Sequence, residues 1–333
     1  MSPGRGGPGR GGPGHTVAEG LYAALAASEP APRAPALVLG GRVVGGDVPA
    51  VMAIVNRTDD SFYAPARYHD DAAAMDAVAR AVDEGAQVVD IGGVRAGVGP
   101  EITPEQEIAR VVPFVARVRR RFPDLVLSVD TWRAEVGRAA AEAGADLLND
   151  TWAGADPGLV EVAGELGLGV VCSHTGGNAP RTDPEHVRFA VPGDAPEGFD
   201  EQDAVVADVV GTVLAGARRA LAAGVPHEAV LVDPTHDFGK RTVDSLRLVR
   251  RTRVLAGLGF PLLMALSRKD FVGETLDLPV EERLEGTLAA TAIAAWEGAT
   301  LFRAHDVRAT RRVLDLVAAV RGELAPRRAV RGL

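Results

Sequence analysis

The sequence predicts an α/β protein of the (β/α)8 TIM-barrel class, and three observations support this prediction. From Val51 onward, eight short apolar runs alternate with eight stretches of helical periodicity. The runs are continuously apolar, which is typical of strands buried on both faces of a parallel sheet. An eightfold repeat of strand and helix closes most naturally into a barrel of about 250 residues.

The alternative fold is an open, doubly wound parallel sheet. Such a sheet normally carries a glycine-rich phosphate-binding turn after its first strand. The segment that follows the first run here, Asn56–Phe62, reads NRTDDSF and contains no glycine. The barrel is therefore the favoured prediction.

The expected strands are the apolar runs at 51–55, 87–91, 125–129, 147–149, 169–172, 229–232, 262–266 and 300–303. The expected helices lie at about 70–84, 104–121, 133–143, 157–166, 201–223, 243–258, 279–296 and 309–321. Two of these helices begin with an N-cap residue followed by proline, at Thr103-Pro104 and Asp156-Pro157. Four are followed by a glycine that fits the C′ position, at Gly85, Gly144, Gly224 and Gly298.

The chain is expected to form one structured domain with a tail at each end. Residues 1–36 begin with a run of Gly, Pro and Arg that cannot bury enough apolar surface to order itself, so we expect a disordered tail. The barrel domain is expected over 37–325, and a short C-terminal tail over 326–333. Residues Val43–Val51 are compatible with a hairpin that covers the bottom of the barrel.

Composition excludes several classes of protein. The 333 residues carry 36 basic and 45 acidic side chains, a net charge of −9, which argues against binding nucleic acid through phosphate contacts. The single cysteine, Cys172, cannot form an intrachain disulfide, and its apolar surroundings favour a core position. No apolar stretch reaches about 18 residues and no secretory leader is visible, so we expect a cytoplasmic protein without membrane contact.

Polar side chains stand at the end of every expected strand. They are Asn56, Asp90, Asp130, Asn149 with Asp150, His174, Asp233, Ser267-Arg268-Lys269, and Arg303 with His305. Barrel enzymes build their active sites at the carboxyl ends of the strands. Turn formation and helix capping explain two or three of these residues, with Asp130-Thr131 and Asp150 the weakest candidates for a functional role.

These residues divide into two chemical groups. Asp130, Asn149 and Asp233 can together bind a flat heterocycle with several N–H donors. Lys269, Arg303, His305 and Ser267 follow strands seven and eight, where barrels commonly bind phosphate. The alternative for Ser267-Arg268-Lys269 is a solvated basic turn, and for His305 a structural histidine. Asn56 can bind a hard cation that bridges phosphates, because Mg²⁺ is usually held by few protein oxygens.

The sequence resembles dihydropteroate synthase, a pterin-binding barrel enzyme of folate synthesis. The resemblance covers about Val51 to Ala319 and rests on motifs that occur in order at the expected strand ends. These are Asn56-Arg57-Thr58-Asp59-Asp60-Ser61-Phe62, Asp90-Ile91-Gly92-Gly93, Ser128-Val129-Asp130-Thr131, Asn149-Asp150, Asp233-Pro234 through Phe238-Gly239-Lys240, Ser267-Arg268-Lys269, and Arg303-Ala304-His305-Asp306-Val307.

The resemblance implies an activity and a role for each site residue. The family joins 6-hydroxymethyl-7,8-dihydropterin pyrophosphate to p-aminobenzoate and releases pyrophosphate. The implied pterin ligands are Asp130, Asn149, Asp233 and Lys269. The implied pyrophosphate ligands are Arg303, His305, Ser267 and Asn56, with Asn56 also binding Mg²⁺, and the loop residues on the p-aminobenzoate side are Phe62, Phe238 and Arg268. A homodimer through the last helices is implied as well. The apolar positions Val313, Leu316, Val317 and Val320 are compatible with it, although packing against the barrel explains them equally well.

The sequence departs from the family in its loops. After Gly92-Gly93 the family has Glu-Ser-Thr-Arg-Pro-Gly, whereas this chain has Val94-Arg95-Ala96-Gly97-Val98-Gly99. In the first loop the family proline is replaced by Asp59. The family Gly-Ile-Gly of the sixth segment is here Thr235-His236-Asp237, and its Met-His-Met after the fifth strand is Ser173-His174-Thr175.

Three functional hypotheses remain open. The first is a working dihydropteroate synthase. The second is a pterin-binding paralogue with weak or no synthase activity, because loops that close over a reaction often carry its chemistry. The third is another pterin-barrel enzyme, such as a folate-dependent methyltransferase. The retained Lys269, Arg303 and His305 count against the third, because methyl transfer needs no pyrophosphate site.

Overall fold

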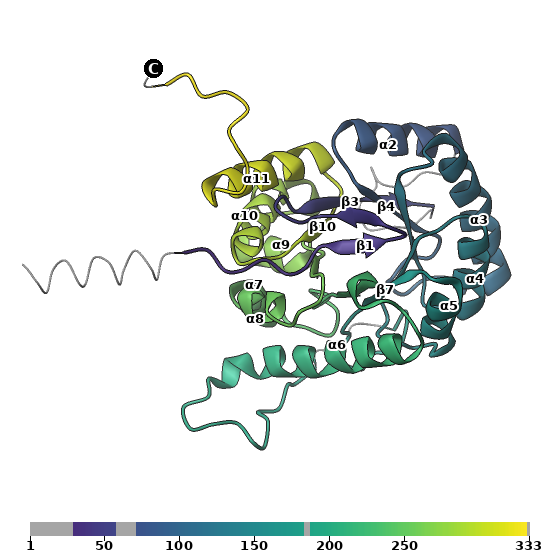
Figure 1. The fold of residues 1–333 in the computed structure, drawn as a ribbon. Coiled ribbons are helices and arrows are strands. Elements are labelled where there is room, and N and C mark those ends of the chain that lie inside the picture. The colour runs from purple at the N-terminus through teal and green to yellow at the C-terminus, as the bar shows by residue number, and fades with distance from the viewer. Residues whose placement is uncertain (1–28, 58–70, 183–186, 332–333) are drawn as a thin grey trace, which may run out of the picture.

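The computed structural model describes residues 29–57, 71–182 and 187–331, and these form a (β/α)8 barrel (Figure 1). The eight barrel strands are β3 (Ala50–Asn56), β4 (Val88–Gly92), β5 (Val126–Asp130), β6 (Leu147–Asp150), β7 (Gly169–Cys172), β8 (Val230–Val232), β9 (Leu263–Met264) and β10 (Leu301–Ala304). Each lies within one of the predicted apolar runs or departs from it by one or two residues. The predicted fold class is therefore confirmed.

The strands close into a ring of parallel pairs. Their order is β8-β7-β6-β5-β4-β3-β10-β9, and a parallel bridge between Val232 and Leu262 joins the two outer strands. Because all the pairs are parallel, all eight carboxyl ends lie at one rim of the barrel. β4 is flanked by β3 and β5, and β8 lies on the opposite side of the ring.

The helices form an outer layer around these strands, with α2 to α5 on one side, α7 to α11 on the other and α6 between them (Figure 1). Their bounds are α2 (Asp71–Asp83), α3 (Pro104–Arg121), α4 (Ala134–Glu142), α5 (Gly158–Leu166), α6 (Ala204–Ala222), α7 (Thr242–Arg250), α8 (Thr252–Ala256), α9 (Asp270–Leu276), α10 (Leu284–Trp296) and α11 (Val307–Val320). Short 3-10 turns lie at Glu201–Asp203, His227–Ala229 and Val280–Glu282.

The predicted start at Thr103-Pro104 is confirmed, whereas α5 begins at Gly158 with Pro157 as its N-cap residue, one position later than the predicted cap at Asp156. The Thr103 Oγ1 accepts from the Gln106 amide at 3.3 Å, and the Gln106 Oε1 accepts from the Thr103 amide at 2.9 Å, which is a complete capping box. Asp156 accepts from the amides of Gly158 and Ala134, so one carboxylate serves the first turns of α5 and α4. The four glycines predicted to follow helices all have positive φ, between 96° and 107°.

The core consists of the strand interiors and the inner faces of the helices. In β3, β4, β6 and β7 almost every residue is buried, as expected for strands covered on both faces. Cys172 is 8% exposed and belongs to this core, which agrees with its predicted role. Burial raises the pKa of its thiol to about 12, so the sulfur is an unreactive apolar group at neutral pH.

A hairpin covers the bottom of the barrel, as predicted, but it lies earlier in the sequence than expected. Its strands are β1 (Leu37–Leu39) and β2 (Arg42–Val44), whereas the sequence suggested 43–51. The turn is Gly40-Gly41, with φ of 54° and 82°, a conformation that glycine adopts without steric cost. Residues 50 and 51 instead begin the first barrel strand.

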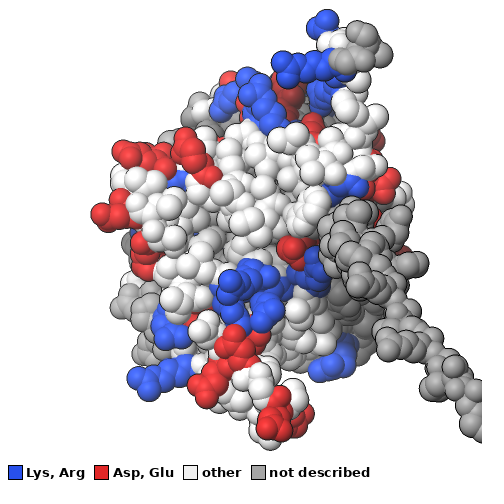
Figure 2. Space-filling view, turned by 90° about the vertical axis from the view of Figure 1, so that its left-hand side faces the viewer, with Lys and Arg blue, Asp and Glu red and all other residues white. Residues whose placement is uncertain are grey.

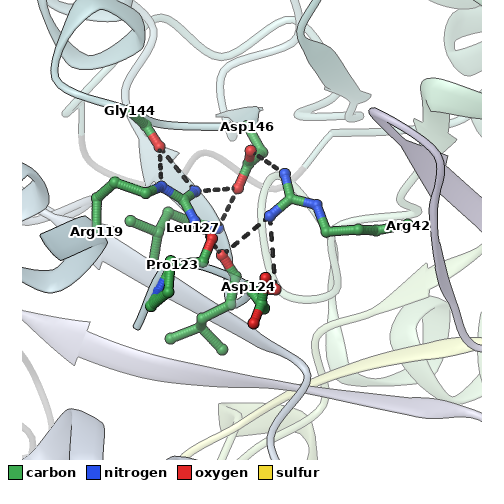
Figure 3. A network of polar contacts seen from close by, with 8 residues as sticks. Arg42, Arg119, Pro123, Asp124, Leu127, Gly144 and Asp146 are labelled. Carbon is green, nitrogen blue, oxygen red and sulfur yellow. Dashed lines mark hydrogen bonds and ion pairs between the residues drawn. The ribbon is translucent and has the colours of Figure 1, made fainter. Parts of the chain in front are cut away.

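Arginines fasten this hairpin to the barrel floor (Figure 3). Asp146 lies between Arg42 of the hairpin and Arg119 of α3, and it pairs with both. Arg42 also donates to the carbonyls of Asp124 and Leu125, at 3.5 and 3.4 Å. The Asp146 carboxylate accepts from the Leu127 amide at 2.8 Å, so the pairs rest on the start of β5. The network lies at the end of the barrel opposite the predicted site.

The N-terminal segment packs against the barrel earlier than the predicted domain boundary at residue 37. Ala31 and Ala34 are 1% and 3% exposed, so the expected disordered tail is too long at its inner end. The Arg33 Nε donates to Glu323 at 2.9 Å, and the Arg321 guanidinium donates to the Ala31 carbonyl at 2.7 Å. These contacts with the C-terminal segment supply the ordering that composition alone does not reveal.

Two further observations complete the fold. Residues 326–331 are exposed and lie outside the helices and strands. No helix within 29–57, 71–182 and 187–331 is both long and apolar enough to cross a membrane.

Candidate functional site

A cavity of about 320 Å³ opens at the carboxyl ends of the barrel strands. It is lined by eight of the residues that the sequence singled out for a site, namely Asn56, Asp130, Phe238, Ser267, Arg268, Lys269, Arg303 and His305. The loop after β4 and the loop after β8 form two of its walls, and Trp152 contributes a third. Asn149 and Asp233 are buried beneath these residues, at 3% and 5% exposed. Phe62 lies outside the described residues.

Arg303 forms the centre of a charged cluster at the cavity floor. Its Nε donates to the Asp90 Oδ2 at 2.7 Å, and its Nη2 donates to the Asp130 Oδ2 at 3.0 Å. Asp90 is completely buried and also accepts from the Ser128 hydroxyl at 2.6 Å and the Asn149 amide at 3.1 Å. The arginine predicted to bind an anion is therefore held by two carboxylates in a fixed orientation.

Asp130 is the carboxylate of this cluster that lies at the cavity surface, with 22% of its side chain exposed. Its Oδ1 accepts from the Thr151 hydroxyl at 2.9 Å. Burial raises the pKa of Asp130 to about 7, and repulsion from Asp90 adds to the effect, while Arg303 opposes it. Asp130 is therefore only partly ionised at neutral pH, and a ligand that donates to it would favour the carboxylate.

Lys269 reaches the cavity from the start of α9. Its ammonium donates to the His236 carbonyl at 2.7 Å and lies 4.6 Å from the centre of the Phe238 ring. Burial lowers the pKa of Lys269, while Asp237 and Asp233 raise it. Lys269 and Phe238 thus form one face of the cavity, a cation beside an aromatic ring.

Ser267 and His305 are paired across neighbouring strands. The Ser267 hydroxyl lies 2.9 Å from the His305 Nδ1, and it accepts from the His305 amide at 3.2 Å. Burial and the nearby charge of Arg303 lower the pKa of His305 to about 3, so the ring is neutral at physiological pH. His305 can contribute a neutral hydrogen bond to an anion but no charge.

The alternative of a solvated basic turn for Ser267-Arg268-Lys269 is wrong, because Ser267 and Arg268 are each only 5% exposed. The Arg268 guanidinium pairs with Asp306 at 2.9 Å and donates to the carbonyls of Val280 and Glu281, both at 2.8 Å. The Arg268 guanidinium is thus already paired with neighbouring loops, although the residue lines the cavity.

The structure adds residues that the sequence did not assign to a role. Asp237, which replaces a family glycine, has φ of 69° and lines the cavity. Its Oδ2 accepts from the Asp270 amide at 2.6 Å, which joins the loop after β8 to α9. The Lys240 ammonium is buried and donates to the carbonyls of His174, Thr235 and Phe238, each at 2.9 Å. The motif contained both residues, but no spacing rule predicts that they would organise this loop.

Asp150 and His174 are further strand-end residues that do not line the cavity. Asp150 accepts from the amides of Trp152 and Gly154, which is the turn-forming role that was its expected alternative. His174 is 1% exposed and its Nε2 lies 2.7 Å from the Asp208 carboxylate on α6. Both residues shape the rim without lining the cavity.

Few protein oxygen atoms at the cavity could bind a hard cation. Within the described parts of the chain, no three His, Cys, Asp or Glu side chains are grouped as a metal site. A β-carbon built on Gly92 would lie 3.2 Å from the Asn56 Oδ1 and 4.0 Å from the Asp130 Oδ2, so these two oxygens flank the same glycine. This donor set fits Mg²⁺ that is held chiefly by a phosphate ligand, because Mg²⁺ usually takes one or two protein oxygens.

Comparison with known proteins identifies the family. The sequence profile described as pterin binding enzyme matches residues 52–305. The chain is 55% identical to inactive dihydropteroate synthase 2 of Mycobacterium tuberculosis over 293 residues, which is 88% of this chain and 89% of that protein. It is 35% identical to dihydropteroate synthase of Escherichia coli over 275 residues, 81% of this chain and 91% of that protein.

A solved structure agrees with the sequence comparisons. Dihydropteroate synthase of Coxiella burnetii in complex with pteroic acid superposes with a TM-score of 0.73 at 29% identity, covering 86% of this chain and 98% of that one. The match extends over the barrel that carries the cavity. This chain therefore belongs to the pterin-binding enzyme family, and within it to the dihydropteroate synthase type.

Proposed function

We propose that this chain binds 6-hydroxymethyl-7,8-dihydropterin pyrophosphate and condenses it with p-aminobenzoate at a rate well below that of an ordinary synthase. The observation that carries the proposal is the cluster of Asp130, Asn149 and Arg303 around the buried Asp90. The cluster puts hydrogen-bond acceptors for a heterocycle beside a cation for a phosphate. Asp233 and Lys269 extend the pterin site.

The proposed reaction is dissociative, and the charges at the site suit it. Loss of pyrophosphate leaves a cationic pterin, which the carboxylates of Asp130 and Asp233 would stabilise. Arg303 and the neutral donors Ser267 and His305 would hold the leaving pyrophosphate. Fixed dipoles and charges of this kind lower a barrier because they need no reorganisation during the reaction.

Mg²⁺ would enter with the pyrophosphate. Asn56 is the protein ligand that we assign to it, because its Oδ1 faces Gly92 beside Asp130. When bound, the ion would neutralise charge on the leaving group. The residues of the chain would then hold the pyrophosphate in place and orient the pterin.

The p-aminobenzoate would lie against the loop after β8. Phe238 would stack against the acceptor, and Lys269 would lie beside it. The Arg268 guanidinium would support this wall through Asp306 and would not contact the acceptor. We retain Phe62 as a further acceptor contact on sequence grounds.

The second candidate is a pterin-binding paralogue without synthase activity. It is favoured by the loop Val94–Gly99, which lacks the Ser, Thr and aligned Arg of the family and yet lines the cavity at residues 94–97. The Mycobacterium tuberculosis relative is named inactive. Losing one group that stabilises transition-state charge typically slows an enzyme by about 10²- to 10³-fold.

One experiment distinguishes slow catalysis from binding alone. The purified protein is incubated with the pterin pyrophosphate, p-aminobenzoate and Mg²⁺, and dihydropteroate is measured by chromatography. We expect tight binding of the pterin pyrophosphate and slow formation of product. Binding with no product at high enzyme concentration would favour the paralogue, and absence of binding would refute both candidates.

Restoring the loop tests the cause of the low rate. The variant R95S/A96T/G97R replaces all three residues together, because a β-carbon on Gly97 would lie 3.2 Å from the present Arg95 side chain. We expect turnover to rise by about 10²-fold. The control R95S/A96T restores the hydroxyls without the arginine. A triple variant no faster than wild type would show that the loop is not the cause.

We also propose that the chain forms a homodimer through its last helices. Figure 2 shows a broad uncharged area on the face where α10 and α11 lie. Ile293 on α10 is 51% exposed, and Leu316 and Val320 on α11 are each 66% exposed. These apolar side chains point away from the barrel, so packing against the barrel does not account for them. Light scattering on Leu316→Lys is expected to give a monomer; a wild-type monomer would contradict the proposal.

A further inference from the structure

The loop after β4 places at the cavity an arginine, Arg95, to which the proposed reaction gives no role. Arg95 lines the cavity together with Val94, Ala96 and Gly97. Its side chain is exposed, and within 29–57, 71–182 and 187–331 its guanidinium forms no salt bridge or hydrogen bond. It differs in this respect from Arg268 and Arg303, whose guanidinium groups are paired with carboxylates.

Gly97 provides the space in which this guanidinium lies. A β-carbon built on Gly97 would be 3.2 Å from the Arg95 Nε, 3.5 Å from its Nη2 and 3.7 Å from its Cζ. The guanidinium is therefore folded over the glycine. Gly97 is not among the glycines with positive φ, so the backbone does not require glycine at this position. Because Gly97 has no β-carbon, the side chain of Arg95 can occupy this space.

The charge balance at the cavity floor calls for another cation. The single positive charge of Arg303 faces Asp90 and Asp130 at 2.7 and 3.0 Å. His305 is neutral because burial lowers its pKa to about 3. A pyrophosphate brings several negative charges, so this cluster alone leaves much of that charge unbalanced. Arg95 is the lining arginine whose charge is not already balanced by a carboxylate among the described residues.

The order of the strands indicates which end of the cavity Arg95 serves. Arg95 follows β4, whose neighbours are β3, which ends at Asn56, and β5, which ends at Asp130. Arg303 on β10 lies directly beyond β3 and bonds to Asp90 of β4. Phe238 follows β8, on the opposite side of the ring. Arg95 thus enters from the side of Asn56 and Arg303 and not from the side proposed for p-aminobenzoate.

We infer that Arg95 is an anion-binding residue that contributes a charge-assisted contact to a pyrophosphate group in the cavity. The inference deepens the proposed function and rests on it for the identity of the complete ligand, the pterin pyrophosphate. The arginine of the family motif is absent from position 97 of this chain. The guanidinium is supplied two residues earlier and lies over the glycine that took the place of the arginine.

The test measures dissociation constants by titration calorimetry on the full chain. The probes are inorganic pyrophosphate with Mg²⁺, 6-hydroxymethylpterin without phosphate, and p-aminobenzoate. Arg95→Ala is expected to weaken pyrophosphate binding by about 10- to 100-fold, the usual effect of losing a charge-assisted contact. Arg95→Lys should lose less, because it keeps the charge but not the planar fork. Binding of 6-hydroxymethylpterin should stay unchanged in both variants.

The matched control is Arg218→Ala, which removes one exposed arginine from α6, away from the cavity. It should bind pyrophosphate as wild type does. Gly97→Ala is an independent variant that keeps the charge and crowds the guanidinium, and it should give a smaller loss in the same direction.

Several outcomes would overturn the inference. They are a wild type that does not bind pyrophosphate, an Arg95→Ala constant within twofold of Arg218→Ala, an equal loss for 6-hydroxymethylpterin, or an effect confined to p-aminobenzoate. If pyrophosphate binding depends on Arg95 but 6-hydroxymethylpterin does not bind at all, Arg95 keeps its role and the proposed pterin function fails. The two proposals are therefore separable.

Discussion

Replacing Asp90 with asparagine tests whether the buried cluster is a principal source of stability at the barrel mouth. The substitution preserves shape but removes the charge that faces Arg303. It also replaces one acceptor oxygen with an NH₂ group. Asp90 now accepts from three donors: the Arg303 Nε, the Ser128 hydroxyl and the Asn149 side-chain amide. The new NH₂ fits only toward Ser128, whose hydroxyl can rotate to accept from it, and Arg303 is then left with a neutral oxygen in place of a charged partner.

The magnitude follows from these contacts. Breaking a buried ion pair from one side typically costs about 3 to 5 kcal/mol. The lower end applies here, about 3 kcal/mol, because Arg303 is 21% exposed and keeps Asp130 as a partner. With an unfolding entropy of about 2.1 cal/mol/K per residue, the 333 residues give about 0.7 kcal/mol/K. The expected fall in Tm is therefore about 4 °C.

The assay is thermal unfolding followed by circular dichroism at pH 8. Asp194→Asn is the control, because Asp194 is exposed and the same change of charge there should leave the Tm within about 1 °C. Ser128→Ala removes only one hydrogen bond to Asp90 and should lower the Tm by about 1 to 2 °C. An Asp90→Asn variant that unfolds with the control would refute the view that Asp90 is the main partner of Arg303.

Three further predictions follow from the structure. Because the pKa of Asp130 is raised to about 7, affinity for 6-hydroxymethylpterin should rise nearly tenfold between pH 5 and pH 6, more slowly up to pH 8, and level off above it. A flat titration, or Asp130→Asn with the same pH dependence, would contradict this. Cys172 should resist a thiol reagent in the native protein and react fully in 6 M guanidinium, and rapid native labelling would argue against its buried position. Gly164→Ala should lower stability by about 2 to 3 kcal/mol in chemical denaturation, since its β-carbon would lie 1.9 Å from the Ala223 carbonyl oxygen. The exposed Gly193→Ala is its control, with nothing within 4 Å of its β-carbon.

The barrel was predictable from the sequence because its strands are buried on both faces. Continuous apolar runs such as Val51–Val55 have no other plausible position in a chain of alternating elements, and the structure places them in β3 and its neighbours. Caps were predictable where one side chain acts on its own turn, as at Thr103. The helix α9 was not predicted, since seven residues without an N-cap hydrogen bond carry too little periodicity.

The site was predictable as a set of residues but not as a set of contacts. Sequence reasoning brought Arg303 and Asp130 to one rim, but it could not show that they bond to each other and to Asp90. Pairing across 173 residues depends on the closed ring, which no local pattern encodes. The same limit applies to Arg268, whose charge is taken up by Asp306 on a neighbouring loop.

The contacts between the two ends of the chain have a consequence for how the protein is made. Arg33 reaches Glu323, and Arg321 reaches Ala31, so segments about 290 residues apart hold each other at the outside of the barrel. During translation the N-terminal segment emerges first and must wait until its last partners have been synthesised. Closing so large a loop carries an entropy cost that only the finished barrel, by holding its two ends together, can reduce. On the ribosome, residues 29–36 should therefore stay accessible to proteases until Arg321–Glu323 have emerged.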